Sequence, residues 1–319
     1  MRRCTPVAFI TAVLFLALAL GIGGARHAPV AADVQLASWR PAQPNLATFV
    51  GNPDAGYSAE VDLRPQIRAR GLHIRNQGNR GTCTVFATTF LIEYQKAGTP
   101  GQAPGLALSE EYLNWAANKV NGQPYFDGGF FTKMIPGFDA WAITTAKDMP
   151  YHQTYNPSAP YRPSKTAIAD AQAMFPSRYH FVTLKIWNDQ VGMNASELQA
   201  VLATLRSGRP VATGIWWLSD FQTVRIHGIP LIKDYPRSAN TGANPPMFDG
   251  HSIDLVGYHL ASDFPGGGYF IFRNSFGKTW GDHGYGFVSF KFMRTYANDA
   301  IAIGPQPWPG VIPKNLPKF

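Results

Sequence analysis

The hydrophobic pattern of the chain changes near residue 175, and this change limits the fold more than any other feature. Before it, the segment 83–96 (CTVFATTFLIEYQK) places apolar residues at helical spacing. After it come short segments typical of strands, at 179–186, 210–217, 252–258, 269–273 and 286–290. Helices first and strands second favour an α+β protein over a repeated β–α–β fold. We therefore predict a helical lobe over about 60–175, a β-rich lobe over about 176–304 and a Pro-rich tail over 305–319.

Several helices can be placed from the sequence. The helix expected over 83–96 is apolar over much of its surface, so it should be central, with Thr82 as a candidate cap. The segment 109–119 opens with a serine followed by two acids, as helix N-termini prefer. A further helix is expected near 138–145, and an amphipathic one over 196–206.

Composition excludes several classes of protein. Hydrophobic residues make up 45% of the chain and charged residues 15%, the reverse of the balance in disordered proteins. The net charge is +8, but the basic residues are scattered and form no Lys/Arg run, so no nucleic-acid partner is predicted. Neither an HExxH nor a CxxC motif occurs, and we predict no metal or organic cofactor.

The N-terminal residues have the three parts of a secretory signal peptide. Arg2 and Arg3 precede an apolar run over about 7–22, and small residues follow as far as Ala32. We expect residues 1–32 to be removed, leaving 33–59 as a linker or short pro-segment of a secreted or periplasmic protein without stable membrane association. An uncleaved membrane anchor is the alternative, although the run is somewhat short of the roughly 20 apolar residues that a spanning helix needs.

The chain contains two cysteines, Cys4 and Cys83. Removal of the leader would leave Cys83 alone, and an odd thiol in an exported protein is a reactive thiol, an intermolecular bridge or a buried inert residue. Cys83 begins the predicted helix, where the partial positive charge and free N–H groups stabilise a thiolate. Gln77 lies six residues upstream across a Gly-rich turn. Its amide and the Cys83 N–H are candidates for an oxyanion hole.

Two further motifs supply partners for such a thiol. His251 heads the apolar segment GHSIDLVGY, and Asn274 ends another predicted strand in RNSFG. The Asn274 amide oxygen would accept the ring N–H of His251 and fix its tautomer, while Phe276 would shield that bond from water. Cysteine, histidine and an orienting amide form the nucleophile, base and orienter of covalent acyl transfer.

These motifs resemble those of the papain family of cysteine peptidases. The match consists of NQGNRGTC (76–83), GHSIDLVGY (250–258) and RNSFGKTWGDHGYG (273–286), in the family's order. The resemblance covers about 60–304. It implies a two-lobed fold in which a helical lobe carries the nucleophile on a central helix and a β-barrel-like lobe carries the histidine and asparagine. An active-site cleft would lie between the lobes.

The resemblance also implies a substrate-binding segment. Gly128 and Gly129 would offer backbone hydrogen bonds to an extended peptide, because a bare backbone lets a second chain approach closely. A simple turn is the alternative interpretation of this pair. The implied partners are a peptide or protein substrate, and we expect a monomer.

The chain also departs from the family pattern. Arg80 and Thr84 stand where the family usually has a disulfide cysteine and a tryptophan, and the family disulfides are absent. The 168 residues from Cys83 to His251 exceed the roughly 130–150 that are usual, which predicts an insertion of loop-forming residues near 218–248 at the rim of the cleft.

Together these features predict a cysteine peptidase that acts through a Cys83 thioester, with His251 as acid and base, Asn274 as orienter and Gln77 in the oxyanion hole. Two alternatives remain. One is a papain-like protein that binds peptides without turnover, and the other is a transpeptidase with a different acceptor.

Overall fold

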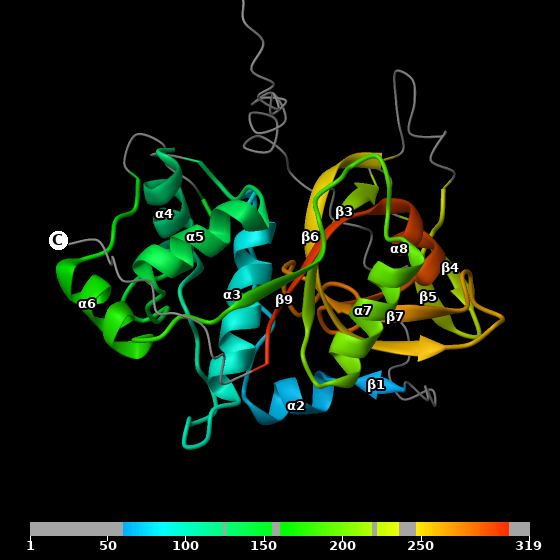
Figure 1. The fold of residues 1–319 in the computed structure, drawn as a ribbon, viewed down its shortest axis with the longest axis horizontal. Coiled ribbons are helices and arrows are strands. Elements are labelled where there is room, and N and C mark those ends of the chain that lie inside the picture. Colours follow the sequence, from blue (N-terminus) through cyan, green and yellow to red (C-terminus); the bar gives the residue numbers. More distant parts are fainter. Residues whose placement is uncertain (1–59, 124–125, 155–159, 219–221, 236–246, 306–319) are drawn as a thin grey trace, which may run out of the picture.

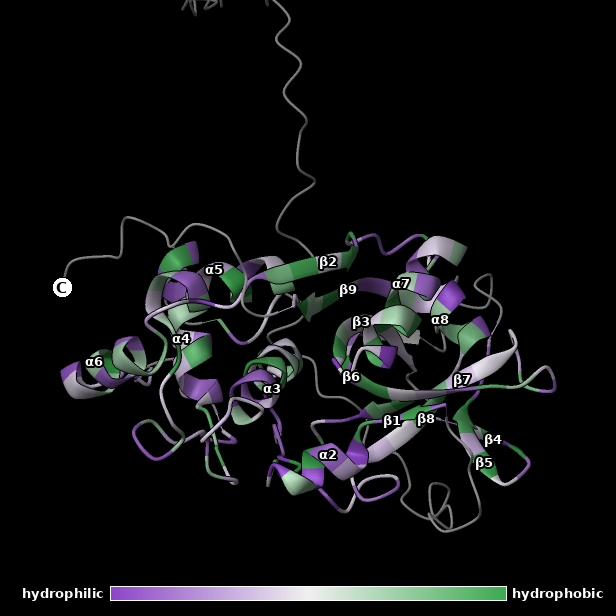
Figure 2. Ribbon diagram, turned by 60° about the horizontal axis from the view of Figure 1, so that its bottom comes forward, coloured by the Kyte–Doolittle hydropathy of each residue, from purple (hydrophilic) through white to green (hydrophobic). Residues whose placement is uncertain are grey.

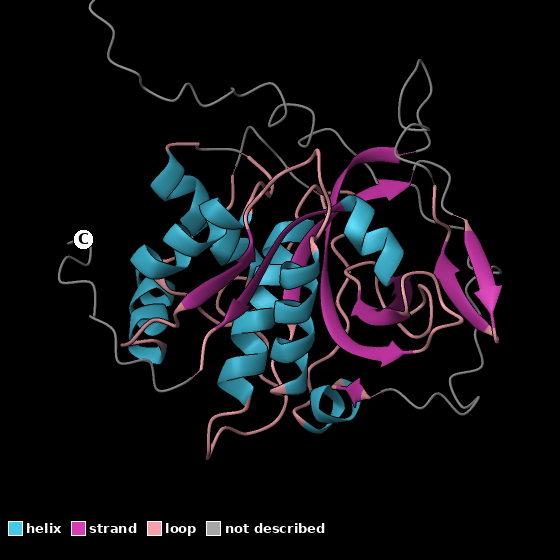
Figure 3. Cartoon of the chain, turned by 45° about the vertical axis from the view of Figure 1, so that its right-hand side comes forward, coloured by secondary structure: helices cyan, strands magenta, loops and turns pink. Residues whose placement is uncertain are grey.

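The computed structural model describes residues 60–123, 126–154, 160–218, 222–235 and 247–305. The predicted leader, the segment 33–59 and nearly all of the Pro-rich tail lie outside these ranges. One side of the molecule consists mainly of helices, and the other contains most of the strands together with further helices (Figure 1, Figure 3). This arrangement confirms the predicted α+β fold with two lobes.

Helix α3 (Cys83–Ala97) lies in the middle of the molecule, as its sequence predicts (Figure 1). Every residue from Cys83 to Tyr94 is buried. Phe90 belongs to the hydrophobic core of the β-rich lobe, whereas Leu91 belongs to the core of the helical lobe. A helix that is apolar all round is stable only when it is covered on all sides. The two lobes therefore share this helix.

The helical lobe is built from α4 (Glu110–Asn121) and α5 (Phe131–Trp141), which pack against α3, and from α6 (Lys165–Met174), which packs against α5. Ser109 caps α4 as predicted, because its side chain accepts a hydrogen bond from the Tyr112 N–H. Helix α5 begins earlier than the helix expected near 138–145. It contains a proline within its span, which weakens the sequence signal for a helix there.

The β-rich lobe contains a sheet whose described strands run in the order β2-β9-β3-β6-β7-β8-β5-β4, with β1 paired to β6. The strands are β1 (Val61–Asp62), β2 (Phe181–Lys185), β3 (Val211–Leu218), β4 (Thr223–Ile226), β5 (Ile229–Ile232), β6 (Met247–Leu260), β7 (Gly268–Arg273), β8 (Tyr285–Ser289) and β9 (Ala297–Ile303). The described path does not return to its start, so the lobe is an open sheet rather than a closed barrel. Strand β9 is mostly hydrophobic and buried along its whole length (Figure 2).

Three helices complete this lobe: α2 (Arg64–Ala69), α7 (Ala195–Arg206) and α8 (Phe290–Tyr296). The described part of the stretch 218–248 contains the β4–β5 hairpin instead of the predicted loop. Its two-residue turn uses positive φ at His227 and Gly228, which suits a tight hairpin. The hairpin lies at the edge of the molecule away from α3 (Figure 1), so it does not line the junction of the lobes. None of the helices within the described ranges has the length and apolar character of a membrane-spanning segment.

Candidate active site

The three sequence motifs meet where the N-terminus of α3 faces the sheet. Cys83 is the first residue of α3, His251 lies in β6, and Asn274 follows the last residue of β7. Thr84 follows Cys83, and Ser252 follows His251. The hydroxyl oxygens of Thr84 and Ser252 lie 2.9 Å apart and form a hydrogen bond. This bond joins the start of the helix to the strand. It places the thiol of Cys83 beside the strand that carries His251.

Cys83 is a free, buried cysteine. Burial raises the pKa of its thiol, while hydrogen bonds from Ser252 and Thr84 act in the opposite direction. The Ser252 contacts include its backbone as well as its hydroxyl. The thiol therefore lies against the backbone of the residue that follows His251.

The ring of His251 is oriented by Asn274. The His251 Nε2 and Asn274 Oδ1 atoms lie 2.8 Å apart, and the same oxygen accepts the Ser275 N–H at 2.8 Å. An oxygen that accepts from a backbone N–H is the carbonyl end of the amide, so Nε2 carries the ring proton of neutral His251. This tautomer leaves the lone pair of the neutral ring on Nδ1.

Aromatic rings enclose the imidazole of His251. The Phe276 ring stacks on it at a centroid distance of 4.8 Å and 27°, and Trp217 meets it edge-on at 4.5 Å. Trp280 packs behind Phe276 at 5.9 Å. Burial in this group lowers the pKa of His251 to about 4, although its bond to Asn274 raises it. Phe276 thus covers the imidazole that bonds to Asn274.

Gln77 is fully buried and its side chain is held at both ends. Its Nε2 donates to the Arg80 carbonyl at 2.8 Å, and its Oε1 accepts from the Ser275 hydroxyl at 2.5 Å. The Gln77 backbone N–H also donates to the Ser275 carbonyl at 2.8 Å. The segment that carries the orienting Asn274 therefore also fixes the amide of Gln77.

The Gly128–Gly129 pair lies beside the nucleophile loop. Gly128 has a φ of 71°, and a Cβ there would lie 2.1 Å from the Gly81 carbonyl oxygen, so only glycine fits. Gly129 has a φ of 120° and is partly exposed. The structure thus gives Gly128 a packing role, and substrate binding by this pair stays a prediction.

Sequence reasoning assigned no structural role to several residues that build this site. Thr84 and Ser252 link helix to strand, Trp217 covers the histidine, and Arg80 is buried between Glu111 and Asp127. No spacing rule relates these residues, because only the tertiary fold brings them together. The one local signal for the ion pairs of Arg80 was the presence of this charged residue inside the Gly-rich segment 76–83.

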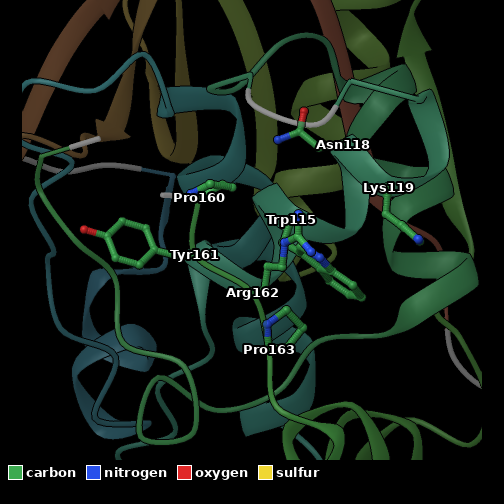
Figure 4. A pocket seen from close by; sticks show the side chains of 7 residues that line it. All are labelled: Trp115, Asn118, Lys119, Pro160, Tyr161, Arg162 and Pro163. Atoms are coloured by element: carbon green, nitrogen blue, oxygen red, sulfur yellow. The ribbon is translucent and has the colours of Figure 1, made fainter. Parts of the chain in front are cut away.

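A cavity of about 330 Å³ lies elsewhere, between α4 and the segment 160–163 (Figure 4). It is lined by Trp115, Asn118, Lys119, Pro160, Tyr161, Arg162 and Pro163. None of the predicted site residues contributes to it. Within the described ranges, no group of three or more His, Cys, Asp or Glu side chains is arranged to hold a metal ion.

Comparison with known proteins agrees with the resemblance that the sequence motifs carry. The family model described as "Papain family cysteine protease" matches residues 57–300. An aleurain-like thiol protease of Arabidopsis thaliana is 26% identical over 66% of this chain and 51% of its own length. A probable cysteine protease of the same plant is 32% identical over 77% of this chain and 57% of its own length. The chain thus spans between half and two thirds of the length of these curated relatives.

Solved structures share the fold. Xylellain, a cysteine protease from Xylella fastidiosa, has a TM-score of 0.58 and 20% sequence identity. The alignment covers 87% of this chain and 94% of xylellain. At this identity the similarity concerns the fold alone.

Proposed function

The chain belongs to the papain family of cysteine proteases, and from this premise we propose that it hydrolyses peptide bonds through a thioester on Cys83. One observation carries the proposal. Thr84 and Ser252, the neighbours of Cys83 and His251, are hydrogen-bonded, and Ser275, the neighbour of Asn274, bonds the amide of Gln77. A protein that only bound peptides would not need all four of Cys83, His251, Asn274 and Gln77.

The proposed reaction begins with proton transfer from the Cys83 thiol to Nδ1 of His251, the ring nitrogen that the Asn274 bond leaves free of hydrogen. The thiolate attacks the carbonyl carbon of the substrate, and the carbonyl oxygen becomes an oxyanion. Its hydrogen-bond donors are the Cys83 N–H and the Nε2 of Gln77. An amide nitrogen carries two hydrogens, and the Arg80 carbonyl takes one of them.

Collapse of this intermediate breaks the C–N bond, and protonated His251 gives its proton to the leaving amine. The product is a Cys83 thioester. Neutral His251 then removes a proton from water, the hydroxide attacks the thioester carbonyl, and the C–S bond breaks. Cys83 leaves as a thiolate and the carboxylic acid product departs.

Peptide or protein chains are the proposed substrates, bound in extended form along Gly129. The test compares hydrolysis of a mixed peptide library by wild-type protein and by Cys83→Ala, with Gln153→Ala as an exposed control near the loop. Cleavage by the wild type and the control but not by Cys83→Ala supports the proposal. Peptide binding without cleavage would favour the non-turnover protein, and transfer to an added amine in place of water would favour the transpeptidase.

The N-terminal leader extends the proposal to location. We infer that residues 1–32 direct export, with Asp33 as the first residue of the mature chain, because the basic, apolar and small-residue regions follow in that order. N-terminal sequencing of protein secreted or released to the periplasm would detect this start. An intact N-terminus in the membrane fraction would contradict it and indicate an anchor.

A further inference from the structure

Arg80 is a buried cation whose hydrogen bonds are complete. Its side chain is 1% exposed. Nε and Nη2 bond the two oxygens of Asp127 at 2.9 and 2.7 Å, and Nη1 and Nη2 bond those of Glu111 at 2.5 and 3.1 Å. Nη1 also donates to the His152 carbonyl at 2.8 Å. All five guanidinium hydrogens therefore have an acceptor.

These bonds connect the nucleophile loop to the segment proposed to bind substrate. Asp127 directly precedes Gly128, whose backbone packs on Gly81, the neighbour of Arg80. Asn114 completes the link, because its Nδ2 donates to Asp127 and its Oδ1 accepts the Gly128 N–H, both at 3.1 Å. The position of Gly128 is thus set by Arg80 through a paired carboxylate.

The backbone of Arg80 serves the other side of the site. Its carbonyl accepts the hydrogen bond from Gln77 Nε2 that orients the amide. One residue therefore contacts both the amide assigned to the oxyanion and the carboxylate that holds the glycine pair. A paired guanidinium and carboxylate fix direction as well as distance, which a lysine at the same place would not do.

We propose that Arg80 is a positioning residue that holds the Gly128–Gly129 segment beside Cys83, so that weakening the Arg80–Asp127 pair impairs binding of extended peptides while the thiol keeps its reactivity. The inference rests on the proposed function. It adds a role for Arg80, which stands where the family usually has a disulfide cysteine.

A merely structural role makes a different prediction. Breaking a buried ion pair leaves an uncompensated charge and lowers stability throughout the molecule. Every activity would then fall together with the fraction of folded protein. Arg64 offers a matched control, because it also pairs with two carboxylates: its Nε and Nη2 bond Asp62 at 3.0, 3.0 and 2.8 Å, and its Nη1 bonds Asp282 at 3.3 Å. That pair lies beside β1, which joins β6 at Tyr258, the end of the strand away from His251.

The experiment compares Arg80→Lys and Asp127→Asn with Arg64→Lys and the wild type at a temperature where all are folded. Two rates are measured for each protein. The first is hydrolysis of a peptide that extends four residues before the scissile bond. The second is alkylation of Cys83 by iodoacetamide, a small reagent that does not need the peptide-binding segment. We expect KM for the peptide to rise about tenfold or more in both site variants, equivalent to about 1.4 kcal/mol. Alkylation should stay within about twofold of wild type, and Arg64→Lys should leave both rates unchanged.

Unchanged KM in folded Arg80→Lys and Asp127→Asn would overturn the inference, as would equal losses of both rates. If Arg80→Lys does not fold, Asp127→Asn carries the test, since Arg80 keeps its pairing with Glu111. Failure of the proposed function is distinguishable, because then wild-type protein itself would not cleave the peptide.

Discussion

At the scale of single residues, the chemistry depends on which ring nitrogen of His251 keeps its proton. The Asn274 oxygen receives the Nε2 hydrogen, so the basic nitrogen is Nδ1. The aromatic enclosure then keeps water from competing for this bond. Because the ring is oriented by Asn274 and shielded from water, its basic nitrogen is held in one direction, whereas a solvated ring would rotate.

The amide of Gln77 allows a direct test at this scale. Gln77→Ala should lower kcat about 10²–10³-fold, because one preorganised donor to the oxyanion is lost. KM should change little, since the donor acts on charge that develops only during reaction. Steady-state kinetics on one peptide substrate measure both constants. A variant with wild-type kcat would show that Gln77 serves only to brace the loop.

The residues of the site were predictable to different degrees. Cys83, His251 and Asn274 could be selected because each occupies a recognisable motif, and Gln77 because of its spacing from the cysteine. The contacts that orient them were not predictable. Ser275, for example, holds Gln77 across nearly two hundred residues of chain, and no local pattern encodes such a pairing.

At the scale of elements, the first turn of α4 carries an unusual carboxyl group. Glu110 is 2.9 Å from Arg75, yet burial outweighs this attraction and raises the pKa of Glu110 to about 7. The folded state thus binds this proton more tightly than the unfolded chain does. Its contribution to stability is complete below the ordinary carboxyl pKa and is lost as the pH rises from about 4.5 to about 7.

Glu110→Gln should therefore flatten the pH dependence of stability. Between about pH 4.5 and 7, the free energy of unfolding should fall by about 3 kcal/mol more in the wild type than in the variant, at about 1.4 kcal/mol per pKa unit. Urea unfolding at several pH values provides the measurement, and Asp170→Asn, an exposed substitution in α6, is the control. A slope identical to that of the wild type would mean that the Arg75 pair keeps Glu110 ionised.

The elements themselves were partly predictable. Strong periodicity located α3 and α7, and serine followed by acids located α4. Strand β9 was missed because its sequence, ANDAIAI, combines alanines with two polar residues, although every one of them is buried. Strand β5 was missed because it contains Pro230, which sequence rules confine to edge positions.

At the scale of the whole molecule, α3 belongs to both hydrophobic cores. Phe90 points into one and Leu91 into the other, so neither lobe is complete without the same helix. No disulfide among the described residues joins the lobes, since Cys83 is free. The shared helix, the Thr84–Ser252 bond and the bonds between Gln77 and Ser275 are among the contacts that couple them.

This coupling predicts a single unfolding transition. Phe90→Ala should cost about 3–5 kcal/mol and Leu91→Ala about 2–5 kcal/mol, and each should shift one transition that involves both lobes. Far-ultraviolet circular dichroism follows the secondary structure of both lobes, and the near-ultraviolet signal follows aromatic packing, which includes Trp217 and Trp280 in one lobe and Trp115 and Trp141 in the other. Separate midpoints for the two signals would show that the lobes unfold independently.

The central claim is that His251 activates Cys83, and the pH dependence of Cys83 alkylation tests it most directly. Proton transfer from the Cys83 thiol to Nδ1 of His251 leaves a thiolate beside an imidazolium, and the two groups titrate together as a pair. Such a pair keeps the thiol nucleophilic well below the pH at which an isolated thiol ionises. Mass spectrometry locates the label on Cys83, and His73→Ala, at an exposed position, serves as control.

The account predicts rapid alkylation down to about pH 4–5 in the wild type and in His73→Ala, and loss of this rapid reaction in His251→Ala. Alkylation that rises only near about pH 8.5, equally in wild type and His251→Ala, would mean an ordinary thiol and would contradict the account.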